Sequence, residues 1–508
     1  MKIARAVRRI SSHTLVFPGL VVAIVFASAV TRVTSYDTWV HLSLGRWMAE
    51  NGRIPRTNLL SYTEPERPVV DHQWLFQAGL YGLWRVAGIG GATLAKAAVA
   101  AAAFGFVLAT ARRKGAGVFV ACLVTLLAAG AARFRFTLRP DVAGLLLLGV
   151  YLYLLERWRH GRVRGILWLL PLQVLWANLH GSSVLGWGLA LAYAAAESLR
   201  TVLHGRLPTA DGRLKSAVED RKSKIALAGL WCVAVALVSL TLLNPFGMRV
   251  LELPFGLAEA HAASGLKELH EERASLAWAD LAGRHLPFAI LAALGAATLI
   301  GSALRKDVTE VGIFLGFLGV ALSSARFIGV FAVAAAPIVA RNLWVMAGAV
   351  ASRRAPRRGV LGRGLLLSAA AALALVGVGW LGIHRTRQEL PWGLGLAEGL
   401  FPEAEAAFVQ ARYPTGNLFN EFEHGGYISW RTRRPVFLDS RGLLAYDARL
   451  LQDYVAAWTS RERWTEVTER YGVAVAMVAR PELQRMFRTG GGWALAFQGP
   501  VCGVFVRR

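Results

Sequence analysis

Two pairs of acid and imidazole side chains lie close together in the first hundred residues. His41 follows Asp37 by one helical turn, which would place both side chains on one helix face, and His72 directly follows Asp71. A carboxylate so placed could act as a general base. Asp37 and His41 could also be ligands of a divalent metal such as Mg²⁺ or Mn²⁺. The structural alternative is that each aspartate caps the helix after it.

A second set of polar residues is mostly cationic. Arg133, Arg135 and Arg139 share one short connection between apolar segments, His180 lies in the sequence Trp-Ala-Asn-Leu-His-Gly, and Arg326 separates two later apolar segments. Guanidinium groups bind phosphate bidentately, so the arginines could hold a phosphate or pyrophosphate. Alternatively, they could extend toward lipid headgroups. A histidine near membrane depth is costly without a partner, which favours a functional role for His180.

A third polar motif lies near the C-terminus, around the dipeptide Gly425-Gly426. Paired glycines permit backbone angles that other residues avoid. Glu421, Asp439 and Arg441 could converge there at strand ends, or they could form an ion-pair cluster that is purely structural. The sequence contains no phosphate-binding loop of the Walker type, no dinucleotide fingerprint, no nucleophile elbow and no HExxH motif.

The elements that carry these residues are mostly apolar. Of 508 residues, 55% are hydrophobic and 18% charged, and the mean hydropathy is +0.43, which indicates a polytopic α-helical membrane protein. Eleven segments approach the roughly 20 residues that a membrane-spanning helix needs. They are 16–33, 92–111, 116–132, 141–156, 165–179, 182–199, 225–243, 287–304, 308–323, 325–343 and 364–383.

The formal net charge of +25 would suit a nucleic-acid partner, so the location of the charge matters. With the N-terminus in the cytoplasm, the inner loops carry 26 Lys and Arg and the outer loops 13. This bias predicts the orientation of the chain in the membrane. It also indicates that most of the positive charge faces the inner membrane surface, where it can interact with anionic lipids. We therefore expect no nucleic-acid partner. The inner loops are expected to be simple basic connectors.

The first outer loop, 34–91, should hold two helices that do not cross the membrane. The stretch 38–51 has mixed polarity and predicts a helix in the membrane plane. If the apolar run 73–88 crossed the bilayer, every later loop would violate the charge bias. We therefore predict that this run lies in the interface or is re-entrant.

The stretch 384–508 has near-balanced charge and predicts a small α/β domain outside the cytoplasm, after a transmembrane domain of residues 1–383. The expected helices are 402–413, 446–458, 460–471 and 481–489, and the expected strands are 436–439, 473–479 and 501–506.

Together these features resemble the GT-C superfamily of polytopic membrane glycosyltransferases, in particular the bacterial mannosyltransferase-like proteins. The resemblance rests on Asp37 just after the first apolar segment, the helix 38–51, the pair Asp71-His72, the turn Arg139-Pro140 and the terminal α/β domain. The short motifs Trp-Ala-Asn-Leu-His-Gly, Asn-Pro-Phe-Gly and Gly-Gly-Tyr with Asp-Ser-Arg are similar to the same bacterial subset.

The resemblance implies transfer of a sugar from a polyprenyl-phosphate carrier, with inversion, at the outer face of the bacterial cytoplasmic membrane. It implies that Asp37 activates the acceptor or organises a metal, with Asp71 and His72 beside it. Arg133, Arg135, Arg139, His180 and Arg326 would then bind the donor phosphate. The acceptor would be a glycan, a lipid or a protein.

Two other functions remain open at this stage. The chain could be an inactive scaffold of the same fold that presents residues 384–508 to partner proteins. A transporter is a weaker alternative, because transport usually needs charged residues inside the spans, and apart from Lys96 and a few acids at span ends the apolar segments lack them.

Overall fold

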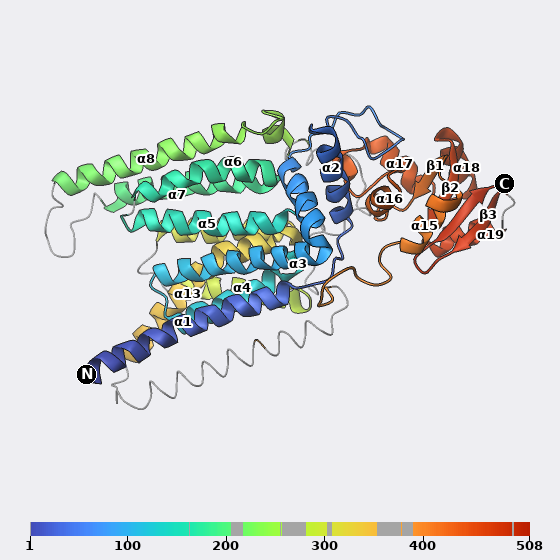
Figure 1. Cartoon of the computed structure of the whole chain (residues 1–508). Helices are drawn as coiled ribbons and strands as arrows, with labels where there is room; N and C mark the ends of the chain where they lie inside the picture. The colour runs from blue at the N-terminus through green and yellow to red at the C-terminus, as the bar shows by residue number, and fades with distance from the viewer. Residues whose placement is uncertain are drawn as a thin grey trace. The chain divides into compact units, whose positions relative to one another are not determined.

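The computed structural model describes residues 2–161, 163–204, 217–253, 256, 281–301, 307–352, 377, 390–489 and 492–508. These residues form a mainly helical protein with one small sheet near the C-terminus, as the sequence predicts (Figure 1). The chain divides into two compact units. The helical unit comprises the described residues of Met1–Thr31, Leu94–Asn244 and Glu272–Gly393, and the sheet unit those of Arg32–Thr93, Pro245–Glu271 and Leu394–Arg508.

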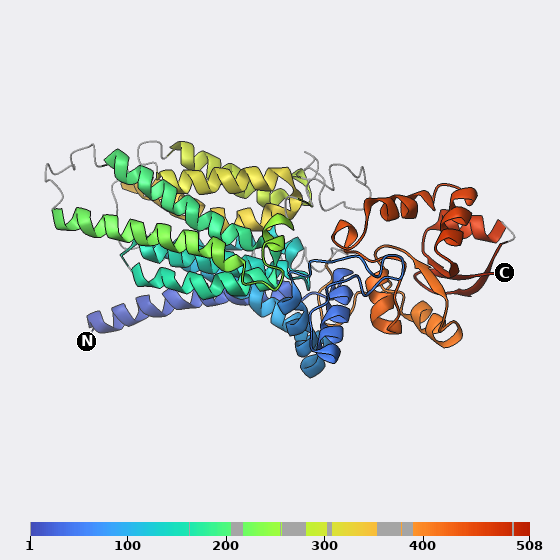
Figure 2. The same ribbon diagram turned by 90° about the horizontal axis from the view of Figure 1, so that it is seen from above.

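The helical unit consists of long helices that lie side by side with similar directions (Figures 1 and 2). Ten α-helices lie wholly or partly in its described residues, and the predicted segment 364–383 lies outside the described residues apart from Gly377. The elements are α1 (Lys2–Ala29), the C-terminal part of α3 (Trp74–Arg113), α4 (Val118–Ala132), η1 (Arg133–Arg135), α5 (Asp141–Arg159), η2 (Val163–Trp168), α6 (Leu169–Leu179), η3 (Gly181–Ser183), α7 (Val184–His204), α8 (Ala217–Thr241), α11 (Leu286–Gly301), α12 (Val308–Ser323), η7 (Ala325–Phe327) and α13 (Ile328–Ser352).

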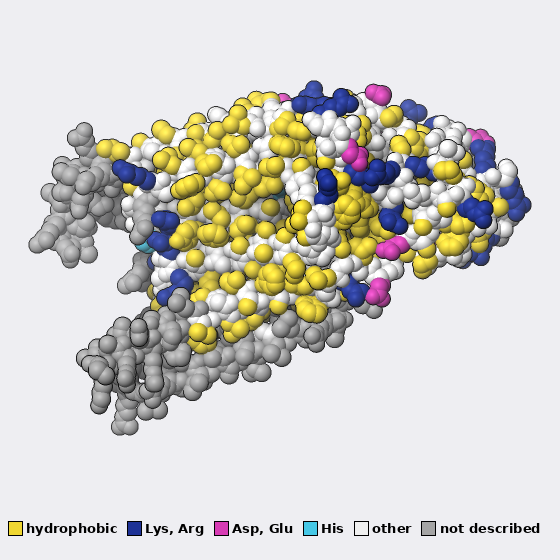
Figure 3. All heavy atoms as spheres, in the orientation of Figure 1, with side chains coloured by type: hydrophobic (Ala, Val, Ile, Leu, Met, Phe, Trp, Pro, Cys, Tyr) yellow, Lys and Arg dark blue, Asp and Glu magenta, His cyan; other side chains and the backbone are white. Residues whose placement is uncertain are grey.

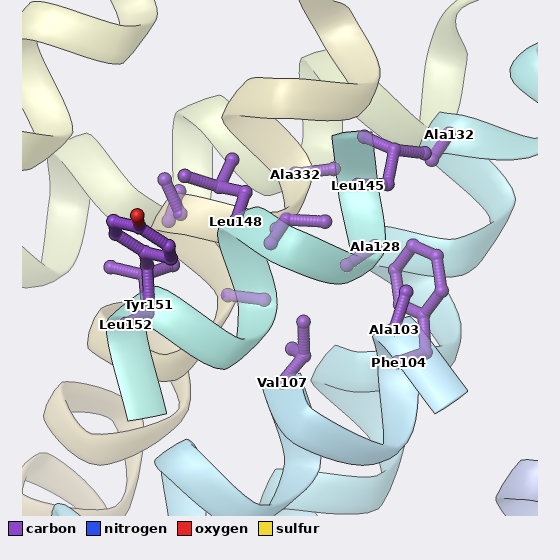
Figure 4. Close-up of a cluster of buried hydrophobic side chains, with 14 of the residues drawn as sticks. Ala103, Phe104, Val107, Ala128, Ala132, Leu145, Leu148, Tyr151, Leu152 and Ala332 are labelled. Carbon is purple, nitrogen blue, oxygen red and sulfur yellow. The ribbon is translucent and has the colours of Figure 1, made fainter. Parts of the chain in front are cut away.

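The core of the helical unit forms around α13, which packs against α4, α5, α11 and α12. Its run of small residues Ala332–Ala336 is buried, and small side chains let neighbouring helices approach closely. Figure 4 shows Ala332 of α13 in one cluster with Leu145 and Tyr151 of α5, Phe104 of α3 and side chains of α4. Close packing of this kind holds the ends of these helices in fixed positions.

The outside of the helical unit is also apolar. Large hydrophobic side chains such as Trp168, Ile225 and Leu315 are exposed, and Figure 3 shows hydrophobic side chains over much of the visible helical surface. In the described chain, four helical stretches are long and apolar enough to cross a membrane, and four further apolar helices are shorter. An apolar exterior over an apolar core suits a membrane environment. The number of eleven spans remains a prediction.

One inner loop is not the simple basic connector that the sequence predicts, because its lysine belongs to a buried cluster of ion pairs. Lys114, in a connection expected to be a simple basic loop, has its Nζ 2.9 Å from Glu156 Oε2 and 3.0 Å from Glu310 Oε1. Arg159 Nε lies 2.7 Å from Glu197 Oε1, and Arg159 Nη2 lies 2.6 Å from Asp307 Oδ2. These charges tie together the ends of α3, α5, α7 and α12. Their burial is tolerable because each is paired.

The sheet unit contains the first loop and the described C-terminal region. Its elements are α2 (Asp37–Asn51), the N-terminal part of α3, α15 (Glu403–Arg412), β1 (Asn417–Asn420), α16 (Gly425–Thr432), η8 (Gly442–Leu444), α17 (Ala448–Ala456), α18 (Arg461–Arg470), β2 (Val473–Val478), α19 (Pro481–Thr489), β3 (Trp493–Gln498) and β4 (Gly503–Arg507). The predicted helix 38–51 therefore corresponds to α2. The backbone of α3 is broken at Gly88, whose φ of 62° interrupts the helix after the run 73–88.

The four strands lie in the order β1-β2-β4-β3, with β1 parallel to β2 and the other pairs antiparallel. In the register, Leu418 faces Val475 and Ala476 faces Phe505. The parallel pair is joined by α16, α17 and α18, which is the crossover that parallel strands require. The sheet and these helices enclose an aromatic core in which Phe419, Tyr454 and Trp464 are buried.

The predicted strand 436–439 is wrong. Val436 makes one isolated parallel bridge with Ser61. The backbone groups of the next two residues form hydrogen bonds with the Asn420 side chain. Asn420 Oδ1 accepts the Phe437 N–H at 2.9 Å and its Nδ2 donates to the Leu438 carbonyl at 2.8 Å. A side chain therefore satisfies the backbone groups that a sheet neighbour would otherwise satisfy.

Candidate active site

Asp37 is the first residue of α2, with Tyr36 at the capping position. Its side chain is held from the C-terminal region: the Ser440 hydroxyl donates to Asp37 Oδ1 at 2.5 Å. Asp37 is thus a first-turn residue, where a negative charge interacts favourably with the helix dipole, and the simple capping role is wrong. The hydrogen bond fixes the orientation of a carboxylate that sequence analysis selected as a general base.

Two glycines allow the elements around Asp37 to approach closely. A Cβ on Gly426 of α16 would lie 2.8 Å from Val40 Cγ2, so α16 packs directly on the first turn of α2. On another side of α2, a Cβ on Gly45 would lie 2.3 Å from the Gln77 carbonyl oxygen of α3. The helix that carries Asp37 is therefore held between two others.

An aromatic layer completes the contact between α2 and the C-terminal region. Trp39 packs edge-on against Phe401 at 5.3 Å and against Tyr427 at 4.9 Å between ring centroids. Tyr36 packs in the same way against His424. Burial lowers the pKa of His424 to about 4, so this imidazole is neutral at pH 7 and supplies no positive charge beside Asp37.

Asp71 is the second acid, and it is held by a different contact. Gln77 Nε2 donates to Asp71 Oδ1 at 2.6 Å, whereas Asp71 Oδ2 is buried without a hydrogen-bond partner among the described residues. Burial raises the pKa of Asp71 to about 6, against the opposing effects of the Gln77 hydrogen bond and the Arg441 charge. A carboxyl group with this pKa can both accept and release a proton near neutral pH.

Ser440 and Arg441, which are adjacent in the chain, connect the two acids. Ser440 donates to Asp37, and the charge of Arg441 acts on Asp71. Arg441 is held in turn by Asp439, which is fully buried, with Nη2 2.6 Å from Asp439 Oδ2. Asp439 Oδ2 also accepts a hydrogen bond of 2.8 Å from the Tyr446 hydroxyl. Although burial opposes its charge, Asp439 raises the pKa of Arg441, so the guanidinium stays charged.

This ion cluster also includes the first loop. Arg441 Nη2 donates to Asn58 Oδ1 at 2.6 Å, and Asn58 Nδ2 donates to the Ala445 carbonyl at 3.0 Å. Of the three residues expected to converge, Asp439 and Arg441 pair with each other. Glu421 accepts the backbone N–H groups of Ala479 and Arg480 instead.

The two predicted histidines are both buried in the structure. His41 is buried with its ring edge-on against Phe76, 5.2 Å between centroids. His72 is buried as well, and its Nδ1 lies 3.3 Å from the Val70 carbonyl oxygen. Within the described ranges, no three His, Cys, Asp or Glu side chains group closely enough to hold a metal ion. Asp37 and His41 do not make a complete metal site there, and metal binding by this pair remains a prediction.

The helical unit brings together another group of predicted residues around Asp141, the first residue of α5. Arg135 Nη2 lies 2.5 Å and His180 Nε2 3.6 Å from Asp141 Oδ1. Arg139 attracts Asp141 electrostatically, and the charge of Arg326 acts on His180 and disfavours its protonated form. Ser182 lies 2.6 Å from His180 Nδ1. Among the described residues, three arginines and one aspartate give this cluster an excess of positive charge, which suits an anionic group.

Arg133 is buried in η1, two residues before Arg135. In the described part of the chain, the predicted acids thus lie in the sheet unit, and the predicted arginines and His180 lie in the helical unit.

No protein-family model matches the chain, and no curated protein matches it. Solved structures do. The archaeal oligosaccharyltransferase AglB from Archaeoglobus fulgidus, in complex with an inhibitory peptide and a dolichol-phosphate, superposes with a TM-score of 0.61 at 13% identity, over 91% of this chain and 69% of that one. ArnT from Cupriavidus metallidurans, bound to undecaprenyl phosphate, superposes with a TM-score of 0.54 at 13% identity, over 97% of both chains.

This chain has the GT-C fold. The expected resemblance is therefore confirmed for the fold, over nearly the whole chain. A further structure of the Archaeoglobus fulgidus oligosaccharyltransferase, in complex with Zn and sulfate, is similar as well, with a TM-score of 0.56 at 12% identity over 91% of this chain and 67% of that one.

Sequence reasoning missed several residues that position the acids in this GT-C fold. Asn58 and Gln77 are ordinary polar residues without a distinctive spacing, and their roles follow only from the folded chain. Ser440 belongs to the Asp-Ser-Arg motif, but nothing in the sequence indicates that its hydroxyl meets Asp37. Asp141 could have been found, because an acid two residues after Arg139 at the start of an apolar segment needs a cationic partner.

Proposed function

We propose that the chain is an integral-membrane glycosyltransferase that moves a sugar from a polyprenyl-phosphate-linked donor to an acceptor outside the cytoplasm of a bacterial cell. The observation that carries this proposal is the Asp37 carboxylate, fixed by Ser440 at the start of α2 in a chain with the GT-C fold. Support for the donor class comes from ArnT bound to undecaprenyl phosphate and AglB bound to a dolichol-phosphate.

In the proposed reaction, Asp37 accepts the proton of the acceptor nucleophile as that atom attacks the anomeric carbon of the donor sugar. A bond forms between the nucleophile and the anomeric carbon, and the bond between this carbon and the phosphate oxygen breaks, with inversion. The polyprenyl phosphate leaves with the electron pair. Asp71, whose pKa lies near 6, is the second group able to hold the released proton.

The leaving phosphate needs positive charge, since negative charge develops on its oxygen in the transition state. We assign this task to Arg135, Arg139 and Arg326 of the helical unit, with Arg133 and His180 as further candidates. Asp141 balances part of their charge and orients Arg135 through the 2.5 Å ion pair. A divalent metal of the kind expected from the sequence enters no step of this proposal.

The test of the catalytic assignment is Asp37→Asn in cells that lack the native chain, with glycan and glycolipid profiles as the readout. Because the asparagine amide cannot accept the proton, we expect sugar transfer to fall about 100-fold or more. The glycan and glycolipid profile should then equal that of cells that lack the chain. Glu50→Gln, on the exposed end of the same helix, is the matched control and should restore the wild-type profile.

The scaffold alternative gives a different result in the same cells. If Asp37→Asn, Asp71→Asn and His72→Ala each restore the wild-type profile while deletion of 384–508 does not, the chain acts by presenting its C-terminal region and the transferase assignment is wrong.

The phosphate assignment is tested separately, by binding of undecaprenyl phosphate to the purified chain in detergent. Arg135→Gln should weaken binding about tenfold or more, because a charge-assisted hydrogen bond contributes about 1.5–3 kcal/mol. Arg164→Gln, which removes an exposed arginine of η2, is the control. Equal affinity of both variants would contradict the assignment of Arg135.

A further inference from the structure

A pocket opens in the sheet unit where one face of α18, the end of α19 and the strands β3 and β4 meet. The pocket is small, with a volume of about 120 Å³, below the roughly 300–1,000 Å³ of sites for drug-sized ligands, and it opens to solvent. None of its residues takes part in the acid site above. The lining residues are Arg461, Trp464, Thr465, Thr468, Met486, Phe487, Gly492, Trp493 and Arg507.

The inner wall of the pocket is aromatic. Trp464 and Phe487 are almost fully buried, with ring centroids 4.6 Å apart, and Trp493 is partly exposed and stacks on Phe487 at 5.7 Å. Trp464 and Trp493 meet edge to face at 5.5 Å. Of the three rings, Trp493 keeps exposed surface, and it offers an apolar face to a flat or ring-shaped group.

The wall also contains a buried donor that needs an acceptor. Trp464 is 1% exposed, and its Nε1 has no hydrogen-bond partner among the described residues. A buried N–H left without an acceptor costs about 1–3 kcal/mol. Because Trp464 lines the pocket, an oxygen atom of a bound molecule is a suitable partner for this group.

Two arginines stand at the rim. Arg461, the first residue of α18, donates to the Met486 carbonyl at 3.3 Å, and Arg507 of β4 lies 2.9 Å from Glu469. The pair of Arg507 and Glu469 is exposed, so it contributes little to stability, and Arg507 can exchange this partner at small cost. Both guanidiniums keep donors for a carboxylate of a ligand. Thr465 adds a hydroxyl at the same rim.

From these contacts we propose that the pocket binds a sugar residue that carries a carboxylate, such as a uronic acid. The C–H face of the sugar ring packs on Trp493, a ring or hydroxyl oxygen accepts a hydrogen bond from the Trp464 N–H, and the carboxylate binds Arg461 and Arg507. The proposal does not depend on the transferase assignment, because it uses no residue of that site.

The experiment measures binding of glucuronic acid, glucose and benzoate to the full-length chain in detergent, by saturation-transfer NMR and calorimetry. The variants are Arg461→Ala with Arg507→Ala, and Trp493→Leu. Arg485→Ala, which changes an exposed arginine of α19 that does not line the pocket, is the control. Thermal melting of each variant establishes that it is folded, and Asp37→Asn separates this binding from transfer.

We expect saturable binding of glucuronic acid that is about tenfold tighter than that of glucose, because the carboxylate adds charge-assisted hydrogen bonds. The double arginine variant should lose this preference, Trp493→Leu should weaken both sugars, and Arg485→Ala and Asp37→Asn should bind as the wild type does. Absence of saturable binding, equal affinity for glucose, equal affinity for benzoate, or an equal loss in Arg485→Ala would each overturn the proposal.

Discussion

Ser440 donates a hydrogen bond of 2.5 Å to Asp37 from a position 403 residues later in the chain. The hydroxyl therefore fixes the orientation of an acid at the start of α2 from the C-terminal region. The next residue, Arg441, acts electrostatically on Asp71, the second acid of the first loop. The C-terminal residues of the sheet unit thus orient Asp37 and act on the charge of Asp71, in addition to forming a core of their own.

Replacement of Ser440 by Ala should lower the rate of transfer. The carboxylate loses a donor that holds it in one orientation, and hydrogen bonds to charged groups contribute about 1.5–3 kcal/mol, so we expect kcat to fall about tenfold to a hundredfold with KM little changed. Ser440→Thr keeps the hydroxyl and should recover most of the rate. A wild-type kcat for Ser440→Ala would show that the hydrogen bond has no part in catalysis.

Replacement of Gly425 by Ala should disturb the same contact through the backbone. A Cβ at this position would lie 2.0 Å from the Leu438 carbonyl oxygen and 3.0 Å from Asp439 Cα, so the segment that carries Ser440 must move. Overpacking of this kind costs about 1–3 kcal/mol, which thermal unfolding in detergent can measure.

The control for Gly425 is Gly82→Ala in α3, where a Cβ meets no atom within 4 Å. There the substitution should be neutral or stabilise the helix by up to about 1 kcal/mol, since alanine is the better helix former. Equal melting temperatures of the two variants would contradict the steric account.

Much of the fold is predictable because its signals are local. The helix 38–51, the apolar run that ends at Gly88 and the C-terminal helix 460–471 follow from periodicity and turn residues, and each corresponds to a helix in the structure. The strands β1 and β3 were missed. Strand β1 has only four residues, two of them Asn, a residue type that is rare in strands.

The site is less predictable because its contacts join distant segments. Asp37 and Asp71 stand out as acids near membrane helices, but nothing local indicates that Ser440 and Arg441 meet them. The same holds for Lys114, which looks like part of a basic loop and is buried between two glutamates. Pairings of this kind depend on packing, which the pattern of one segment does not contain.

Replacement of Arg441 by Ala should strongly destabilise the sheet unit. Asp439 is fully buried, and without the guanidinium its charge keeps only neutral partners such as Tyr446. Breaking a buried pair costs about 3–5 kcal/mol, so the melting temperature should fall markedly. Arg67→Ala breaks an exposed pair with Asp447 and should cost less than about 1 kcal/mol. A similar fall in both variants would contradict the assigned importance of burial.

The raised pKa of Asp71 predicts how stability depends on pH. In the unfolded chain this group has its ordinary pKa of 3.8, whereas in the folded protein the value is about 6. Between these values the folded state keeps a proton that the unfolded state has lost, so the contribution of Asp71 to stability falls as pH rises. Above pH 6, ionisation of the buried Asp71 lowers the free energy of unfolding by its full amount of about 2–3 kcal/mol.

Asp71→Asn removes this titration and keeps an amide of similar shape. Relative to the wild type, its melting temperature should therefore rise when the pH is raised from 4.5 to about 7.5, because only the wild type must then bury a carboxylate. Glu50→Gln, an exposed acid of α2, should follow the wild type at both pH values. If the difference between Asp71→Asn and the wild type is the same at both pH values, Asp71 does not titrate in this range, and its proposed role as proton carrier near neutral pH is wrong.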